Sequence, residues 1–286
     1  MTSNTAIVGV DFSTHGEAAL DWGIQHAEQF GWQLEVVHAW SYPWWAATPF
    51  GTAEAEAKDE VVSSARRHLA AWLQRHLPEG VAAPRQSVVE GDASVVLSEE
   101  AADAAAIVIG SGGRRAATAW LTGAVGRRLA AASPVPVVIV PDDREADPAR
   151  PIAVGVDGSS NSINALRWAV EHAQAGQPVR AVTTWTSSAA HLVGVVVSDL
   201  ELMETSARQQ LGSALEKAAA DGLDVSAVES VVAYGDPRTV LREMEDDAAM
   251  VVVGSRGSSG VAGVLVGSVT SSLVHRPGCP LVVVPA

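Results

Sequence analysis

The sequence predicts an α/β protein made of two tandem, doubly wound, Rossmann-like parallel sheets with five strands each. Three observations carry this prediction: an internal repeat, an alternation of short β-branched runs with helical stretches, and strands that are apolar on both faces. Runs such as AAIVIG (105–110) and MVVVG (250–254) show no alternation of apolar and polar residues. This pattern is typical of parallel strands covered by helices on both sides.

The repeat consists of five blocks that return in the same order, with an offset between 144 and 146 residues. The duplicated unit has about 140 residues, a common domain size. We expect domain 1 at residues 1–141 and domain 2 at 151–286, joined by a charged, proline-containing linker at 141–151. The paired blocks are AIVGVDFS (6–13) and IAVGVDGS (152–159), VVHAW (36–40) and AVTTW (181–185), VEGD (89–92) and AYGD (233–236), IVIGSGG (107–113) and VVVGSRG (251–257), and PVVIVP (136–141) and PLVVVP (280–285).

The second repeat has the cleaner pattern of elements. Ile163, Leu166, Ala169, Val170 and Ala173 recur at helical spacing, which predicts an amphipathic helix after the first strand. Applied along the repeat, the same reasoning predicts strands at 151–156, 179–185, 225–233, 249–254 and 280–284, and helices at 160–174, 198–220, 237–247 and 268–275.

Composition narrows the function classes. The 19 Lys and Arg residues against 33 Asp and Glu give a net charge of −14, and Lys58 and Lys217 are the only lysines. This balance argues against nucleic acid and anionic membrane surfaces as partners. One cysteine, Cys279, cannot form an internal disulfide, and neither a signal peptide nor a transmembrane segment is evident, so a cytoplasmic location is expected.

The segment GSRGSSGVAGVLVGSVTSSL (254–273) has the chemistry of a phosphate site. Gly254 and Gly257 allow the backbone to approach an anion closely, and Gly267-Ser268 opens the next helix, whose free N–H groups favour phosphate. No GxxxxGK[ST] loop is present, and no GxGxxG follows the first strand. Any phosphate is therefore expected to bind to main-chain amides, at the carboxyl ends of the strands.

The Gly254-x2-Gly257-x9-Gly267-Ser268 spacing, together with the VGVDGS and VVVGSRG blocks, resembles the ATP-binding branch of the universal stress protein family in its tandem two-domain form. The resemblance covers almost the whole chain. It implies the strand order 3-2-1-4-5 in each domain, pairing of the fifth strands between domains, ATP as ligand, and a cytoplasmic role in stress tolerance or growth control. A homodimer is a further expectation.

The resemblance also implies which residues bind the nucleotide. Asp157 is expected at the adenine or ribose end, Thr184 beside the adenine, and the glycine segments around the ribose and phosphates. The ATP-binding residues expected in domain 2 are Gly155, Asp157, Thr184, Gly254, Ser255, Arg256, Gly257, Ser258, Ser259, Gly260, Gly267, Ser268 and Val269. Those expected in domain 1 are Gly9, Asp11, Ala39, Gly110, Ser111, Gly112, Gly113, Gly123, Ala124 and Val125.

Domain 1 keeps the glycine spacing but departs from the pattern after Gly123. Ala124 stands where domain 2 has Ser268, so one hydroxyl donor is lost, a change of about 1 kcal/mol. Arg127 and Arg128, together with Arg114 and Arg115, are candidates to compensate. We expect both domains to bind ATP, with domain 1 the weaker site.

Simpler roles remain for several of these residues. Asp157 and Asp11 could cap the following helix, and Arg256 could lie in solvent. The recurring pairs Trp22 and Trp168, and Trp40 and Trp185, fit core packing better than ligand stacking. His26 and His172 are expected to be partly exposed, Cys279 is expected to be a buried apolar thiol, and no metal site is expected.

Two function classes compete. A nucleotide-dependent regulator needs only the glycine-rich segments that bind the phosphates, called the glycine cradle below. An ATPase or a phosphoryl or nucleotidyl transferase also needs a general base or acidic Mg²⁺ ligands near the terminal phosphate. Residues 254–274 contain neither His nor acid. We therefore expect a regulator without catalytic residues, with weak hydrolysis as the alternative. Triphosphates generally bind Mg²⁺, so the sequence leaves open whether Mg²⁺ binds together with ATP.

Overall fold

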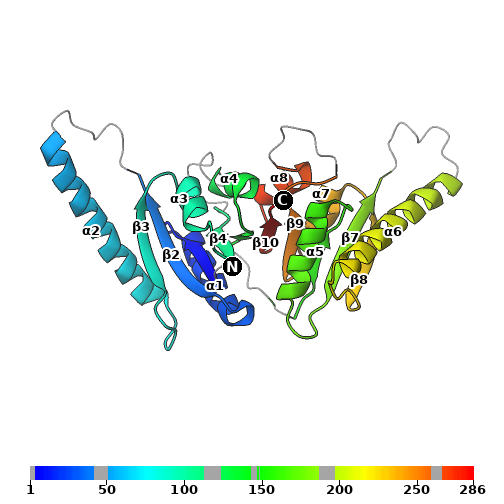
Figure 1. Cartoon of the computed structure of the whole chain (residues 1–286), viewed down its shortest axis with the longest axis horizontal. Helices are drawn as coiled ribbons and strands as arrows, with labels where there is room; N and C mark the ends of the chain where they lie inside the picture. The colour runs from blue at the N-terminus through cyan, green and yellow to red at the C-terminus, as the bar shows by residue number, and fades with distance from the viewer. Residues whose placement is uncertain are drawn as a thin grey trace.

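The computed structural model describes residues 4–41, 51–112, 124–142, 147, 149–186, 197–258 and 266–286; for 51–58 and 197–199 it describes the backbone alone. Strands and helices alternate through both halves of the chain (Figure 1). The first half contains β1 (Thr5–Gly9), α1 (Thr14–Phe30), β2 (Gln33–Trp40), α2 (Gly51–His76), β3 (Arg85–Glu90), α3 (Ala93–Glu100), β4 (Ala106–Gly110), α4 (Ala124–Ala132) and β5 (Val137–Val140).

The second half repeats this order. It contains β6 (Ile152–Gly155), α5 (Ser160–His172), β7 (Val179–Trp185), α6 (Val197–Ala220), β8 (Val228–Tyr234), α7 (Pro237–Met244), β9 (Met250–Gly254), α8 (Ser268–His275) and β10 (Leu281–Val284). The predicted elements are confirmed, and α7 and β8 differ most from the expected bounds. α7 ends at Met244 rather than at residue 247 because the next amides bond three residues back, as Glu245 does to Arg242. β8 begins at Val228, after a turn closed by the Val225 carbonyl.

The two five-stranded sheets join into one sheet of ten strands, in the order β3-β2-β1-β4-β5-β10-β9-β6-β7-β8. Within each half the strands are parallel, and each half has the expected order 3-2-1-4-5. β5 and β10 pair antiparallel at the centre, with Leu281 opposite Ile139 and Val283 opposite Val137. The expected pairing of the fifth strands is therefore confirmed, and it occurs within one chain.

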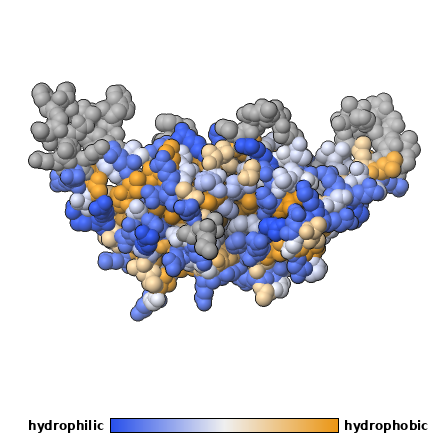
Figure 2. Space-filling model, in the orientation of Figure 1, coloured by the Kyte–Doolittle hydropathy of each residue, from blue (hydrophilic) through white to orange (hydrophobic). Residues whose placement is uncertain are grey.

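Helices cover both faces of the sheet and bury successive strand residues on opposite sides. Val8 and Val108 face the layer of α1, α2, α5 and α6, whereas Ile7 and Ile107 face the layer of α3, α4, α7 and α8. This two-sided burial explains why the strands read as unbroken apolar runs. The outer surface is mainly hydrophilic on the side seen in Figure 2. None of the described helices combines the length and the apolar character needed to cross a membrane.

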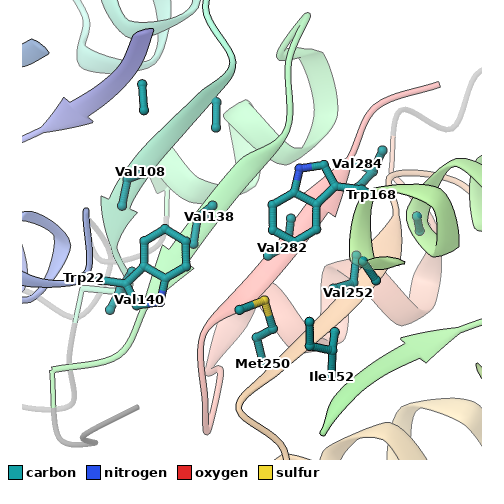
Figure 3. Close-up of a cluster of buried hydrophobic side chains, with 14 of the residues drawn as sticks. Trp22, Val108, Val138, Val140, Ile152, Trp168, Met250, Val252, Val282 and Val284 are labelled. Atoms are coloured by element: carbon teal, nitrogen blue, oxygen red, sulfur yellow. The ribbon is translucent and has the colours of Figure 1, made fainter. Parts of the chain in front are cut away.

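An aromatic cluster joins the two domains between α1 and α5. Trp22 and Trp168 are buried, as expected, in one core cluster with Val138 and Val282 (Figure 3). Phe30 bridges the domains: its ring centroid lies 5.9 Å from that of Trp168 and 4.8 Å from that of His172. Trp40 and Trp185, at the strand ends, are only half-buried.

The two histidines of this cluster have the same geometry. Each stacks on the tryptophan four residues earlier, and its Nδ1 lies 2.8 Å from that residue's carbonyl oxygen. The expectation that His26 is partly exposed is wrong: it is 7% exposed, because its ring packs against those of Trp22 and Phe30. His172 is half-buried. Cys279 is buried, as expected.

Candidate functional site

A cavity of about 410 Å³ opens at the carboxyl ends of β6, β7 and β9, where the strand order of domain 2 reverses. Ligands of open α/β sheets bind at this position. The lining contains ten of the thirteen residues expected in domain 2: Gly155, Asp157, Thr184, Gly254, Arg256, Gly257, Ser258, Gly267, Ser268 and Val269. Ser259 and Gly260 lie outside the described residues.

Ser255 supports the cavity instead of lining it. It is buried, its amide donates to the Val284 carbonyl at 2.7 Å, and its own carbonyl accepts the Gly267 amide at 2.9 Å. These two bonds tie the end of β9 both to β10 and to the start of α8. The backbone of Ser255 thus fixes the distance between the two glycine segments of the cradle.

Two glycines of the cradle could not carry a side chain. A Cβ on Gly254 would lie 2.9 Å from the backbone carbon of Asn161, and a Cβ on Gly257 would lie 2.6 Å from the Asp157 carboxylate. Gly267 is different, because the nearest atom to its Cβ would be 3.5 Å away. The close approaches explain the first two glycines, whereas the third keeps space open over the start of α8.

Asp157 places its carboxylate in this cavity, and the structure shows that it is not the residue that caps α5. The side chain that caps α5 is Ser159, whose hydroxyl accepts the Ser162 amide at 3.2 Å. Asp157 instead accepts the Ser159 hydroxyl at 2.6 Å, the Ser159 amide at 3.1 Å and, across the cavity, the Ser258 amide at 2.5 Å. Burial acts to raise the pKa of Asp157, but these hydrogen bonds outweigh it and hold the pKa below the ordinary value.

The start of α8 differs from the other helix starts whose capping residue is described. Ser13, Asp92, Ser159 and Asp236 each accept a backbone amide of the helix that they open. At α8 the capping residue is Gly267, which provides no side-chain acceptor, and the first helical bond is that of Ser271 to the Gly267 carbonyl. Gly267, Ser268, Val269 and Thr270 all line the cavity. The free amides of the first turn are therefore available to a ligand.

The structure adds lining residues that sequence reasoning missed. Thr183 donates its hydroxyl to the Val156 carbonyl at 2.6 Å, and Gln210 of α6 donates to the Asp157 carbonyl at 2.6 Å. On the other face of the sheet, Pro237 and Leu241 come from α7. Helical periodicity could have placed Leu241 toward the sheet, but nothing local to Gln210 indicates that α6 reaches the loop after β6.

Domain 1 has the same framework. Gly9 and Asp11 lie at the end of β1, Ala39 near the end of β2, and Gly110 at the end of β4; Ser111 donates its amide to the Val140 carbonyl at 2.8 Å, as Ser255 does to Val284. A Cβ on Gly110 would collide with the backbone of His15. Gly112 has a left-handed φ of 67°, and Ala124 and Val125 open α4. Gly113 and Gly123, with Arg114 and Arg115, lie outside the described residues.

The largest difference between the two domains lies in the loop after β1. Phe12 replaces Gly158 and keeps a left-handed φ of 63°. Its ring centroid lies 4.3 Å from that of His38 and 4.4 Å from that of His68. His38 contacts the Val10 carbonyl through Nδ1 at 2.9 Å, the bond that Thr183 makes in domain 2. Aromatic and imidazole rings thus take the positions of small polar groups.

The two described arginines of α4 lie toward the domain boundary. Arg128 forms an ion pair with Asp92 at 2.7 Å, and both Arg127 and Arg128 line a groove between α4 and α8. In domain 2, Arg256 is exposed at the rim of the cavity. Arg127 and Arg128 therefore lie at the boundary with domain 2, and their compensation for the missing hydroxyl stays a prediction.

Comparison with known proteins agrees with this architecture. The model of the universal stress protein family matches twice, at residues 3–141 and 148–285. Universal stress protein Rv2005c of Mycobacterium tuberculosis is 30% identical over 97% of this chain and 95% of its own length. Universal stress protein Rv2623 of the same organism is 28% identical over the same shares.

Among solved structures, a universal stress protein from Archaeoglobus fulgidus aligns with a TM-score of 0.61 and 20% identity, covering 100% of this chain and 99% of that chain. A functionally unknown protein, PA1789 from Pseudomonas aeruginosa, aligns with a TM-score of 0.60 and 15% identity, covering 99% and 92%. Both likenesses show the fold. The chain belongs to the universal stress protein family, whose domain it carries twice in tandem.

Proposed function

We propose that each domain binds ATP at the carboxyl edge of its sheet, and that the protein is a cytoplasmic regulator of stress tolerance or growth whose state depends on nucleotide occupancy. Membership of the universal stress protein family supports the class of function. The cavity of domain 2, with its glycine cradle and uncapped helix, supports the ligand.

One observation carries the proposal: the helix that opens into the cavity lacks a side-chain cap. Amides without a side-chain cap are left to water or to a ligand, and the positive end of the helix dipole favours an anion there. The four other helix starts whose capping residue is described, those of α1, α3, α5 and α7, are capped by serine or aspartate. Gly267 therefore leaves room for a phosphate where other helices place a side chain.

Asp157 supplies the opposite end of the site. Its lowered pKa keeps the carboxylate ionised at neutral pH, so it accepts hydrogen bonds and repels phosphate. Hydroxyl groups of a ribose are donors of the kind that it requires. The polarity of the cavity, with a carboxylate near β6 and free amides at α8, therefore favours a ligand with a sugar at one end and phosphates at the other.

The same residues favour a regulator over an enzyme. Among the described residues that line the cavity, Asp157 is the one carboxylate, and its oxygens already accept bonds from Ser159 and Ser258. These described lining residues include neither His nor Lys. A general base for attack on a terminal phosphate would need such a group within hydrogen-bond reach. Slow hydrolysis, or slow phosphoryl or nucleotidyl transfer, is the alternative.

Two measurements test the proposal. Mass spectrometry of small molecules released by denaturing the purified protein should detect ATP; ADP accompanied by turnover would favour the enzyme. In the second, Gly267→Asp places a capping carboxylate over the α8 amides, at a backbone conformation (φ −62°, ψ 152°) that aspartate adopts readily.

We expect this variant to lose ATP binding in domain 2 while its free energy of unfolding rises by about 0.5 kcal/mol from the cap and the helix dipole. Gly267→Asn is the matched control, since it caps without adding charge and should weaken ATP less. Unchanged ATP affinity in Gly267→Asp, measured by calorimetry, would contradict the proposed phosphate position.

A further inference from the structure

The glycine cradle of domain 2 contains two residues that lie between two fixed points of the backbone. Ser255 is fixed by the two backbone hydrogen bonds described above. Three residues later, the Ser258 amide donates to Asp157 Oδ2 at 2.5 Å, a bond to a residue 101 positions earlier in the chain. Arg256 and Gly257 lie between these fixed points, and both line the cavity. The second fixed point therefore ties the cradle to the loop after β6.

The amides of Arg256 and Gly257 differ from those on either side. Within the part of the chain that the structure describes, neither donates a hydrogen bond, whereas the Ser255 and Ser258 amides both do. A Cβ on Gly267 would lie 3.5 Å from the Gly257 nitrogen, so this amide borders the start of α8. Two successive free amides beside the start of a helix provide a group of donors that suits an anion.

The carboxylate that holds the cradle is itself held in place. Asp157 Oδ1 accepts the Ser159 amide at 3.1 Å and the Ser159 hydroxyl at 2.6 Å. The backbone carbonyl of Asp157 accepts the Gln210 side chain at 2.6 Å. These bonds leave Oδ2 in a defined position, and an ionised acceptor forms a stronger hydrogen bond than a neutral one. The bond to Ser258 therefore sets where the cradle lies relative to β6.

We propose that Asp157 is a positioning residue for the phosphate site: by holding the Ser258 amide, it keeps the free amides of Arg256 and Gly257 in place for the phosphates. The inference rests on the proposed function and gives Asp157 a second role beside that of a ribose acceptor. A carboxylate has about four acceptor sites, and the donors from Ser159 and Ser258 leave room for a ribose hydroxyl. Without the bond to Ser258, the cradle would have to become ordered as the phosphates bind, which lowers affinity.

The test removes the bond but keeps the carboxylate. Ser258→Pro deletes the amide donor at an exposed position and leaves the charge of Asp157, and the preceding Gly257 tolerates the restriction that proline imposes. Ser258→Ala is the matched control, because it removes the hydroxyl and keeps the amide. Calorimetric titrations with ATP and with adenosine compare both variants with Ser258, each in a full chain whose domain 1 site is blocked by Gly113→Val. The unfolding temperature verifies the fold.

A second measurement needs no ligand. Hydrogen exchange, followed by mass spectrometry, is measured on the peptide that contains Gly257 and Ser258, in the unaltered protein and in Asp157→Ala. The bond predicts faster exchange of this peptide in Asp157→Ala, whereas the peptide that contains β10 should not change.

Ser258→Pro should lower the affinity for ATP about tenfold, roughly the cost of ordering one residue, and the affinity for adenosine by less than about twofold. Ser258→Ala should change neither by more than about twofold. The inference is overturned if ATP and adenosine weaken equally, if Ser258→Pro weakens ATP no more than Ser258→Ala does, or if the exchange is unchanged in Asp157→Ala. Absence of ATP binding in the unaltered protein would contradict the proposed function, while the exchange measurement would still decide whether Asp157 holds the cradle.

Discussion

The two domains share one framework but hold the loop after their first strand in different ways. In domain 2, Gly158 takes a left-handed φ of 78° without a side chain, and Gln210 of α6 donates a hydrogen bond to the Asp157 carbonyl at 2.6 Å. In domain 1, Phe12 takes the same conformation with φ at 63°, and its ring stacks on His68 of α2.

This difference shows that one backbone can be stabilised by unlike chemistry. Both domains tie the loop to their second helix, domain 2 by a hydrogen bond and domain 1 by ring stacking. Domain 2 thereby keeps a polar cavity wall of Thr183 and Gln210. Domain 1 fills the corresponding place with the rings of Phe12, His38 and His68. The two sites are therefore expected to differ in affinity and in ligand preference.

The largest expected effect comes from blocking one cradle at a time. Gly257→Val places its Cβ 2.6 Å from the Asp157 carboxylate and displaces the Ser258 amide, so ATP affinity of domain 2 should fall by at least about 100-fold. Calorimetry should then show one site per chain instead of two. Gly113→Val makes the corresponding change in domain 1.

Gly212→Val serves as the control, because no atom lies within 4 Å of a Cβ at this position of α6. It should retain both sites. Equal residual affinity in Gly113→Val and Gly257→Val would contradict the ranking of the domains, since each variant isolates the site of the other domain.

The next effect concerns the stability of the domain 1 loop. Phe12→Gly relieves the left-handed backbone, a gain of about 1 kcal/mol, but loses the contacts of the ring with His38, His68 and Trp72, a loss of about 3 kcal/mol for a half-buried aromatic residue. We expect the free energy of unfolding to fall by about 2 kcal/mol in urea denaturation. In domain 2, Gly158→Ala should cost about 1 kcal/mol, because alanine is strained at this φ.

A stability equal to or above that of the unaltered protein would show that the backbone strain at Phe12 outweighs its ring contacts. Phe12→Leu separates the two terms, because it keeps the strain and removes the stacking.

The sequence predicted the strands and helices well, because they depend on local periodicity and on repeated motifs, whereas the joining of the fifth strands came from the resemblance to the universal stress protein family. The glycine spacing of domain 2 likewise located a cavity. Positions where the backbone closely approaches another group accept only glycine, so they can be recognised in the sequence. Phe12 was missed because its partners, His38 and His68, are 26 and 56 residues away and are selected by the register of β2 and α2. His26 was misjudged because its ring stacks on Trp22 and lies against Phe30, side-chain contacts that the helical spacing alone does not indicate.

The aromatic cluster between the domains predicts a dependence of stability on pH. Burial lowers the pKa of His26 and His172 below the ordinary value of 6.5, more than their hydrogen bonds to the Trp22 and Trp168 carbonyls and, for His172, the charge of Glu171 raise it. The unfolded chain therefore binds more protons than the folded chain below this pH. Stability should fall as the pH falls below the ordinary histidine pKa.

Urea denaturation at about pH 7.5 and about pH 5.5, on either side of the ordinary histidine pKa, measures this effect. His172→Phe keeps a ring against Phe30 and removes one titrating group, so it should lose less stability over the same interval. A loss in His172→Phe as large as that of the unaltered protein would assign the pH dependence to groups outside this boundary.

The smallest expected effect tests the ranking of the sites through a single hydroxyl. Ser268→Ala removes from domain 2 the donor that domain 1 lacks, and Ala124→Ser restores it at the start of α4. One neutral hydrogen bond contributes about 1 kcal/mol, so ATP affinity should fall about fivefold in the first variant and rise about fivefold in the second. Each is measured with the other domain blocked by Gly113→Val or Gly257→Val. If the exchange leaves the difference between domains unchanged, the ranking depends on other differences at the crevice, namely the rings of Phe12, His38 and His68 or Ala39 in place of Thr184.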